Sequence, residues 1–333
     1  MHRPVLVRLQ GGLGNQLFQY AAALELSEVR RCDVMVYGHE DVIRVLEAAL
    51  DARLPRVEAK LDLTVPVAVR PKEMKGSQRL LIRVLGKAAG TRTNLIRQLP
   101  QQAHAAPTSQ VRRAMRSKRS VAFDGYFQHA DFAGSSIDIV ASLLAARIPA
   151  ATRRPDTVGI FVRRGDYVSL GFQLSPDFYF AALEIADSER HCSVLVACDD
   201  RLAGQSVARE LEARGWAAAL APASVQAPVH EDLFALAGCR HLVMSNSTYS
   251  WWGAKIGDIL WRDENRRVIA PDPWSPGPER PSPPRGWYAL PARLERDADP
   301  SQPVTAKGLD SERLDQRTGS KSGPLSERPG ARE

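Results

Sequence analysis

Residues 157–167 read TVGIFVRRGDY, a short apolar run that ends in two arginines, a glycine and an aspartate. Such a run, bounded by turn-forming residues, is typical of a strand buried in a sheet. Similar runs recur farther along the chain, and helical periodicity fills the intervals. The strands are predicted at residues 157–162, 193–197 and 241–244, and the helices at residues 176–187, 201–214 and 231–238. Strands that alternate with helices predict a parallel sheet.

The N-terminal part of the chain begins in the same way. A β-branched run at residues 5–9 leads into the glycines of GGLGNQLFQYA, residues 11–21, and a second strand is predicted at residues 34–37. Between these strands the apolar residues recur at helical spacing. Residues 52–120 lack clear periodicity and are predicted to be mostly helix and loop.

The length and composition fit two domains followed by a tail. The chain has 333 residues, of which 44% are hydrophobic, and this suffices for two medium-sized cores. We predict an N-terminal domain over residues 1–150 and a C-terminal domain over residues 151–296. Residues 297–333 contain almost no apolar side chains and are predicted to be disordered.

Charge and hydropathy exclude several classes of protein. No run approaches the roughly 18 to 20 apolar residues of a membrane span, and the N-terminal run is too short for a signal peptide, so a cytoplasmic location is expected.

The net charge of +7 is concentrated between Arg70 and Arg119, where thirteen Lys or Arg residues accompany one acid, Glu73. We expect residues 70–119 to hold the protein against the inner face of an anionic membrane. A solvated helical face with a basic loop is the alternative.

Nucleic acid and structural zinc are not expected. The sequence contains no helix-turn-helix, zinc-finger or RNA-binding aromatic signature that would give the basic stretch such a partner. The four cysteines form no CxxC pair, so they predict neither a zinc site nor a disulfide framework.

The glycine turn at residues 11–14 resembles a dinucleotide fingerprint but lacks its third glycine. Leu17 stands at that position, which argues against close packing of a helix on a pyrophosphate. We therefore predict a substrate-facing turn, in which Gly12 and Gly14 permit close approach and Asn15 positions a substrate. The alternative is an ordinary turn with Asn15 as a helix cap.

Arg163, Arg164 and Asp166 follow the predicted strand at residues 157–162. The carboxyl ends of parallel strands are where ligands bind, and a guanidinium can hold two oxygens of a diphosphate at once. We expect Arg164 to bind the diphosphate and Arg163 to tie into Asp166. A purely structural pair is the alternative.

Polar residues end two other predicted strands. Asn246, Ser247, Thr248 and Tyr249 stand where a helix begins, and a helix N-terminus favours phosphate, so a donor-binding role is predicted for them. The alternative is a capped, Trp-rich core helix. Asp199 is predicted to accept from a ribose or guanine, or else to cap a helix with Asp200.

Together these motifs resemble the bacterial α-1,2-fucosyltransferase family, which is glycosyltransferase family 11-like. The matching segments, in the order of the family, are GGLGNQLFQYA, FDGYFQ (residues 123–128), FVRRGDY, ACDD (197–200), EDLFALAGCRH (231–241), SNSTYSWWGA (245–254) and VIAPDPW (268–274).

The resemblance implies a GT-B α/β fold, with two Rossmann-like domains facing a cleft. It implies that the N-terminal half holds an oligosaccharide or lipid-linked acceptor, the C-terminal half holds GDP-fucose, and no metal ion or other cofactor is used. The implied reaction inverts the anomeric carbon and joins L-fucose to the 2-hydroxyl of a galactoside in surface glycan or lipopolysaccharide synthesis. Arg164, Arg163, Asp166 and Asn15 are the predicted catalytic residues. The predicted donor-binding residues are Asn246, Ser247, Thr248, Tyr249, Asp199, Gly12 and Gly14.

Two positions depart from the family pattern. Phe161 stands where the family usually has His, and Lys255 stands where it often has Trp. A histidine near the donor offers hydrogen bonds that a phenyl ring lacks. A non-catalytic GDP-sugar-binding protein, or a transferase with another donor or acceptor, is therefore the alternative function.

Overall fold

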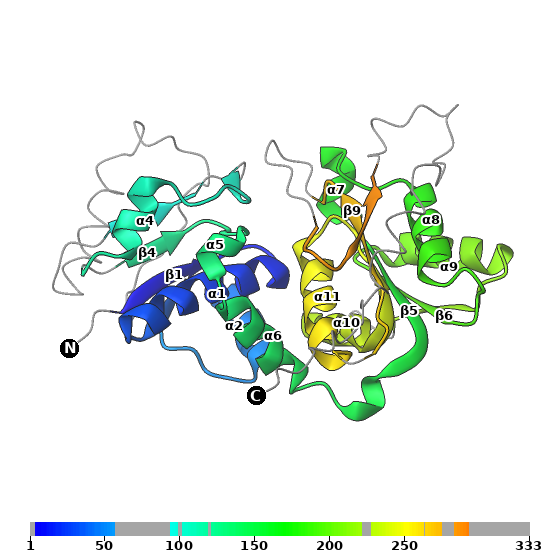
Figure 1. Cartoon of the computed structure of the whole chain (residues 1–333), viewed down its shortest axis with the longest axis horizontal. Coiled ribbons are helices and arrows are strands. Elements are labelled where there is room, and N and C mark those ends of the chain that lie inside the picture. Colours follow the sequence, from blue (N-terminus) through cyan, green and yellow to red (C-terminus); the bar gives the residue numbers. More distant parts are fainter. Residues whose placement is uncertain are drawn as a thin grey trace, which may run out of the picture.

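The computed structural model describes residues 4–56, 94–98, 102–118, 121–221, 228–262, 264–274 and 283–292. These residues form two lobes that lie side by side, each built on a parallel sheet (Figure 1). The predicted tail at residues 297–333 and most of the basic stretch at residues 70–119 lie outside the described residues.

The N-terminal lobe contains a four-stranded sheet in the order β2-β1-β4-β3. Its strands are β1 (Val5–Leu9), β2 (Val34–Gly38), β3 (Asn94–Arg97) and β4 (Val121–Asp124). The described helices of this lobe are α1 (Leu13–Arg30), α2 (Glu40–Leu50), α4 (Ser109–Met115), α5 (Ala130–Ala133) and α6 (Ser136–Ala145).

The prediction of mostly helix and loop over residues 52–120 missed β3. This strand has only four residues and pairs with β4 alone among the described strands, so its sequence carries no clear period.

The C-terminal lobe contains a six-stranded sheet in the order β10-β9-β8-β5-β6-β7. Its strands are β5 (Arg154–Val162), β6 (Ser193–Cys198), β7 (Ala218–Leu220), β8 (Cys239–Val243), β9 (Val268–Asp272) and β10 (Tyr288–Pro291). The connecting helices are α7 (Gly165–Leu170), α8 (Pro176–Ala186), α9 (Arg201–Ala213), α10 (Val229–Gly238) and α11 (Thr248–Leu260), after the short helix η3 (Ala150–Thr152).

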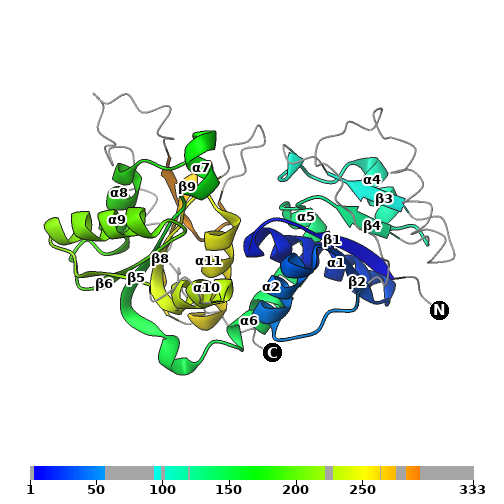
Figure 2. The ribbon, with the colours of Figure 1, turned by 180° about the vertical axis from the view of Figure 1, so that it is seen from behind.

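The strand order identifies the C-terminal lobe as a doubly wound fold. Numbered from β5, its strands run 3-2-1-4-5-6 across the sheet, and every pair is parallel. This is the Rossmann order, in which the chain changes direction between the first and fourth strands, here β5 and β8. Helices α8 and α9 cover one face of the sheet, while α10 and α11 cover the face turned toward the other lobe (Figures 1 and 2). The predicted fold class is confirmed.

The lobes share a hydrophobic core. One buried cluster runs from β1 and β4 through α1 and α6 to α10 and α11. At its centre the ring of Phe18 lies 4.8 Å from that of Trp251 and 5.3 Å from that of Trp252, centroid to centroid. Burial of such aromatic rings is worth several kcal/mol, so it fixes α1 on α11. We call this α1–α11 contact the seam.

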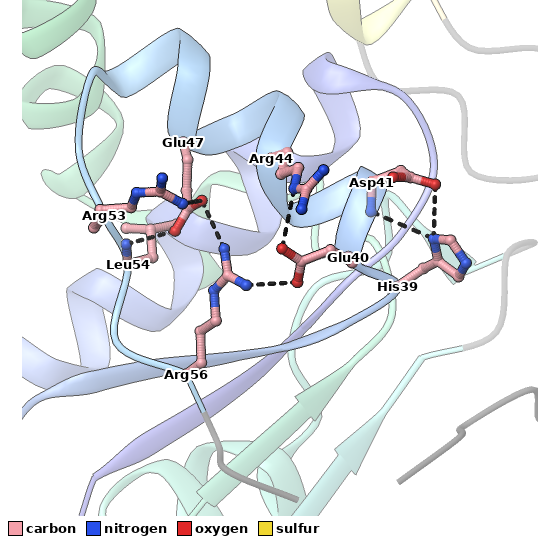
Figure 3. Close-up of polar contacts among 8 residues, drawn as sticks. All are labelled: His39, Glu40, Asp41, Arg44, Glu47, Arg53, Leu54 and Arg56. Atoms are coloured by element: carbon pink, nitrogen blue, oxygen red, sulfur yellow. Dashed lines mark hydrogen bonds and ion pairs between the residues drawn. The ribbon is translucent and has the colours of Figure 1, made fainter. Parts of the chain in front are cut away.

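A charged network fixes the chain that leaves α2 (Figure 3). The buried carboxylate of Glu47 accepts hydrogen bonds from the Leu54 backbone N–H at 2.9 Å and from Arg56 at 2.7 Å. Arg56 also donates to Glu40 at 2.5 Å, and these two acids raise the pKa of its guanidinium. Because both ends of α2 hold Arg56, residues 51–56 return to the edge of the sheet beside β2.

Candidate functional site

The loop that follows β5 wraps around one carboxylate. Arg163 donates to Asp199 at 2.5 Å and to Asp166 at 2.6 Å, and the backbone N–H of Arg164 donates to Asp199 at 2.7 Å. Gly165 has φ +22°, and a Cβ there would lie 2.6 Å from Oδ2 of Asp199. A glycine is therefore required where the loop turns over the carboxylate. Arg163 and Asp199 together set the conformation from which the half-buried Arg164 side chain extends.

This geometry changes the interpretation of the two aspartates after β6. Both oxygens of Asp199 accept hydrogen bonds from the loop at residues 163–166, which we call the arginine loop. Asp199 therefore braces this loop. A contact of Asp199 with ribose or guanine stays a prediction. Asp200 caps α9 by accepting from the backbone N–H groups of Leu202 and Ala203 at 3.0 and 3.2 Å, which is the alternative weighed for it from the sequence.

Asn246 and Tyr167 tie the arginine loop to the end of β8. The Tyr167 hydroxyl donates to the Asn246 carbonyl at 3.1 Å, and the Asn246 side-chain amide donates to the Phe172 carbonyl at 2.7 Å. Burial raises the pKa of Tyr167 to about 12, so its hydroxyl remains a donor near neutral pH. Oδ1 of Asn246 is buried without a hydrogen-bond partner among the described residues. An unsatisfied acceptor beside β5 and β8 is available to a donor group of a ligand.

Helix α11 begins next to this loop and meets the start of α1. Ser247 is its N-cap and accepts from the Tyr249 backbone N–H at 3.2 Å. Oδ1 of Asn15, in the first turn of α1, accepts from the Thr248 hydroxyl at 2.9 Å and from the Gln128 amide at 2.8 Å. The predicted catalytic residue Asn15 thus joins the two lobes. Gln128 had no predicted role, although it lies within the FDGYFQ motif.

Two aromatic residues of the motifs face the interior. The Tyr249 hydroxyl donates to the Val229 carbonyl at 2.5 Å, and its ring lies 5.0 Å from that of Phe161, centroid to centroid. Phe161 is 5% exposed and belongs to the core that spans both lobes. Phe161 therefore packs against α11 in this structure. The donor-binding role predicted for Tyr249 stays a prediction.

The predicted site residues gather where the two lobes meet. The arginine loop and the Asn246–Thr248 segment follow β5 and β8, on either side of the switch point of the C-terminal sheet, where doubly wound folds bind their ligands. The glycine turn, with Asn15, approaches them from the N-terminal lobe. Gly14 packs directly on α11, whereas a Cβ at Gly12 would meet no atom within 4 Å.

The described residues contain no group of three or more His, Cys, Asp or Glu side chains arranged to hold a metal ion. In the same part of the chain, no helix combines the length and the apolar character that crossing a membrane requires.

Comparison with known proteins agrees with the motifs. The family model of glycosyl transferase family 11 matches residues 122–259, which include the FVRRGDY and SNSTYSWWGA segments. An alpha-1,2-colitosyltransferase of Escherichia coli is 24% identical over 287 residues, covering 81% of this chain and 92% of that protein. The O-antigen biosynthesis glycosyltransferase WbnK of Escherichia coli is 22% identical over 298 residues, covering 81% and 94%.

Solved structures with a similar backbone include glycosyltransferases. NodZ alpha-1,6-fucosyltransferase soaked with GDP-fucose matches with a TM-score of 0.44 and 15% identity, covering 77% of this chain and 93% of that one. POFUT1 in complex with GDP matches with a TM-score of 0.45 and 11% identity, covering 80% and 98%. The family resemblance predicted from the motifs is confirmed by the family model, and glycosyltransferase activity follows at this coarser level.

Proposed function

We propose that the chain moves L-fucose from GDP-fucose to the 2-hydroxyl of a galactoside-type acceptor, because residues 122–259 match the family model of glycosyl transferase family 11. The proposed transfer inverts the anomeric carbon and forms an α-1,2 linkage. The name of the O-antigen biosynthesis relative favours a role in surface glycan synthesis. The observation that carries the proposal is the meeting of the arginine loop and the start of α11 at the switch point of the C-terminal sheet.

The proposed reaction is a single displacement. The oxygen of the acceptor hydroxyl attacks the anomeric carbon, the bond from that carbon to the β-phosphate oxygen breaks, and GDP leaves with the electron pair. Arg164 and the N–H groups at the start of α11 stabilise the charge that develops on the diphosphate, so no metal ion is needed for it. The proton of the acceptor passes to water or to Asp166, whose side chain is 61% exposed.

Lysine substitutions of the two arginines test this account. Lysine keeps the charge but loses the planar fork, so Arg164→Lys should lower kcat on the order of a hundredfold or more, about 3 kcal/mol. Arg163→Lys is the matched control, because Arg163 bridges Asp166 and Asp199 and its loss should affect the melting temperature more than kcat.

The assay is GDP release at saturating acceptor in excess EDTA, with circular dichroism to check the fold. The account is wrong if Arg164→Lys keeps most of its activity, or if EDTA abolishes that of the unaltered enzyme. GDP binding without turnover on any acceptor would instead favour a non-catalytic GDP-sugar-binding protein.

One comparison favours a different sugar donor. The relative named an alpha-1,2-colitosyltransferase suggests a colitosyl donor in place of the fucosyl donor. Parallel assays with both nucleotide sugars and with GDP-mannose, at equal acceptor concentration, decide between them by kcat/KM.

A further inference from the structure

The N-terminal sheet carries a row of polar side chains near the carboxyl ends of its strands. Arg8 on β1 pairs in register with Tyr37 on β2, and Arg97 on β3 pairs with Asp124 on β4. Since β1 and β4 are neighbours and Arg8 contacts Asp124, the four side chains cross the sheet in one line near its carboxyl end. Ligands of parallel α/β sheets bind at the carboxyl ends of the strands, so this end of the sheet is the candidate ligand-binding edge of the lobe. We call these residues the arginine row.

The carboxylate of Asp124 pairs with the guanidinium groups of both Arg8 and Arg97. Arg97 holds Oδ2 of Asp124 through its Nε at 2.8 Å and its Nη2 at 2.7 Å. Arg8 reaches the other oxygen, Oδ1, at the longer distance of 3.3 Å. The side chains of Arg8, Asp124 and Arg97 are 17%, 11% and 29% exposed, so the net positive charge of the three groups is partly withdrawn from water. Such a charge is costly unless an anion compensates it.

Tyr126 connects the arginine row to the proposed reaction site. It follows β4, and its ring lies 3.3 Å from the position that a Cβ on Gly11 would take. Burial raises the pKa of its phenol, with Arg8 of the N-terminal lobe and Asp166 of the arginine loop acting on it in opposite directions. The Tyr126 ring thus places the end of β4 beside the glycine turn that leads to Asn15, in the lobe to which the family resemblance assigns the acceptor.

We propose that Arg8 and Arg97, spaced by Asp124, bind an anionic group of the acceptor glycan. This inference rests on the proposed function, since it names the class of acceptor for the same site. A planar guanidinium holds two oxygens of a carboxylate or a phosphate, so the group is either the carboxylate of a uronic acid or the diphosphate that links a glycan to its carrier.

A set of three acceptors separates the two sources. The first is a neutral methyl β-galactoside, the second is the corresponding methyl galacturonide, and the third is the galactoside joined through a diphosphate to a short prenyl chain. Binding is measured by calorimetry and transfer by GDP release, at low and high salt. The unaltered protein should bind one charged acceptor about tenfold or more tightly than the neutral one, because charge-assisted hydrogen bonds are the strong ones. Salt should reduce this preference.

The variant Arg8→Gln should abolish the preference and leave binding of the neutral galactoside within about twofold. Its matched control is Arg44→Gln, which removes one positive charge from an exposed pair with Glu40 on α2 of the same lobe. Arg8→Lys keeps the charge and should retain part of the preference, which guards against a misfolded glutamine variant.

Equal affinity of the unaltered protein for all three acceptors would overturn the inference, as would an equal effect of the two glutamine variants. Calorimetric binding tests the anion site, and GDP release tests the proposed fucose transfer. A preference for a charged acceptor without fucose transfer would leave the anion site intact and refute the proposed function, whereas transfer without preference would do the reverse.

Discussion

Replacing Gly14 with alanine should loosen the seam between the lobes, whereas the same change at Gly12 should leave the seam intact. A Cβ on Gly14 would lie 2.5 Å from the backbone nitrogen of Tyr249 and 2.6 Å from the carbonyl carbon of Thr248. These are backbone atoms at the start of α11, so they have no rotamer by which to move away. A Cβ on Gly12 would meet nothing within 4 Å.

The expected cost follows from two opposing terms. Overpacking in a rigid site costs about 1 to 3 kcal/mol, and contact with backbone places Gly14→Ala at the upper end. The alanine recovers about 1 kcal/mol of helix propensity, because Gly14 lies inside α1, so a net loss of about 2 kcal/mol remains. Gly12 is the N-cap of α1 with φ −72°, which alanine adopts without strain, and its replacement should cost less than about 1 kcal/mol.

Urea unfolding of both variants, followed by circular dichroism, measures these costs, and transfer kinetics show where the glycines act. Gly14→Ala should lower the urea midpoint. Gly12→Ala should keep the urea midpoint and raise the KM of the substrate that binds in front of the glycine turn, because the new methyl group occupies that space. The reasoning fails if Gly14→Ala unfolds at the same urea concentration as the unaltered protein, or if Gly12→Ala is the less stable variant.

Two further predictions concern stability. Burial lowers the pKa of His241 from 6.5 to about 4, and its Nδ1 accepts from the Arg267 backbone N–H at 3.0 Å. The unfolded chain takes up this proton first as the pH falls, so stability present above pH 6.5 should be lost between about pH 6.5 and 4. His241→Asn should flatten that decline in urea unfolding series at several pH values. Lys255 on α11 contacts Asp138 on α6 at 2.7 Å, with side chains 27% and 63% exposed. A double-mutant cycle with Lys255→Gln and Asp138→Asn should give a coupling of about 0.2 to 1 kcal/mol that decreases with salt; a coupling that salt leaves unchanged would contradict a solvent-screened pair.

In the C-terminal sheet, the three strands that the sequence predicted are the central ones, β5, β6 and β8, whereas β9 was missed although its first four residues are buried. The last six residues of β5 are all buried, and β6 and β8 lie beside it at the centre of the sheet, so their apolar runs are continuous. The strands that escaped prediction in this sheet are β7, β9 and β10. Both β7 and β10 are edge strands of three and four residues, respectively, and their side chains are only partly buried. Without burial on both faces, a strand of that length has no distinctive pattern.

The location of the candidate site followed from strand ends, but the direction of its side chains did not. Arg164 and Thr248 were predicted as site residues because polar residues follow buried strands, and parallel strands bring such residues to one edge. That Phe161 and Tyr249 face the core depends on α11 packing across β5, and this contact joins residues far apart in the chain. Local sequence patterns carry no information about such a contact.

Residues of the motifs contact other segments of the chain as well as the proposed substrates. Asn15, Gln128 and Thr248 belong to three separate motifs and meet at one amide oxygen. Replacing Asn15 removes the acceptor of both other residues, and an unpaired polar group costs about 1 to 3 kcal/mol when buried, so the three motifs are linked through this amide whatever the acceptor is. Arg8 lies outside the motifs, while its partner Asp124 lies inside FDGYFQ, so the proposed anion site joins a motif residue to a residue that no motif contains.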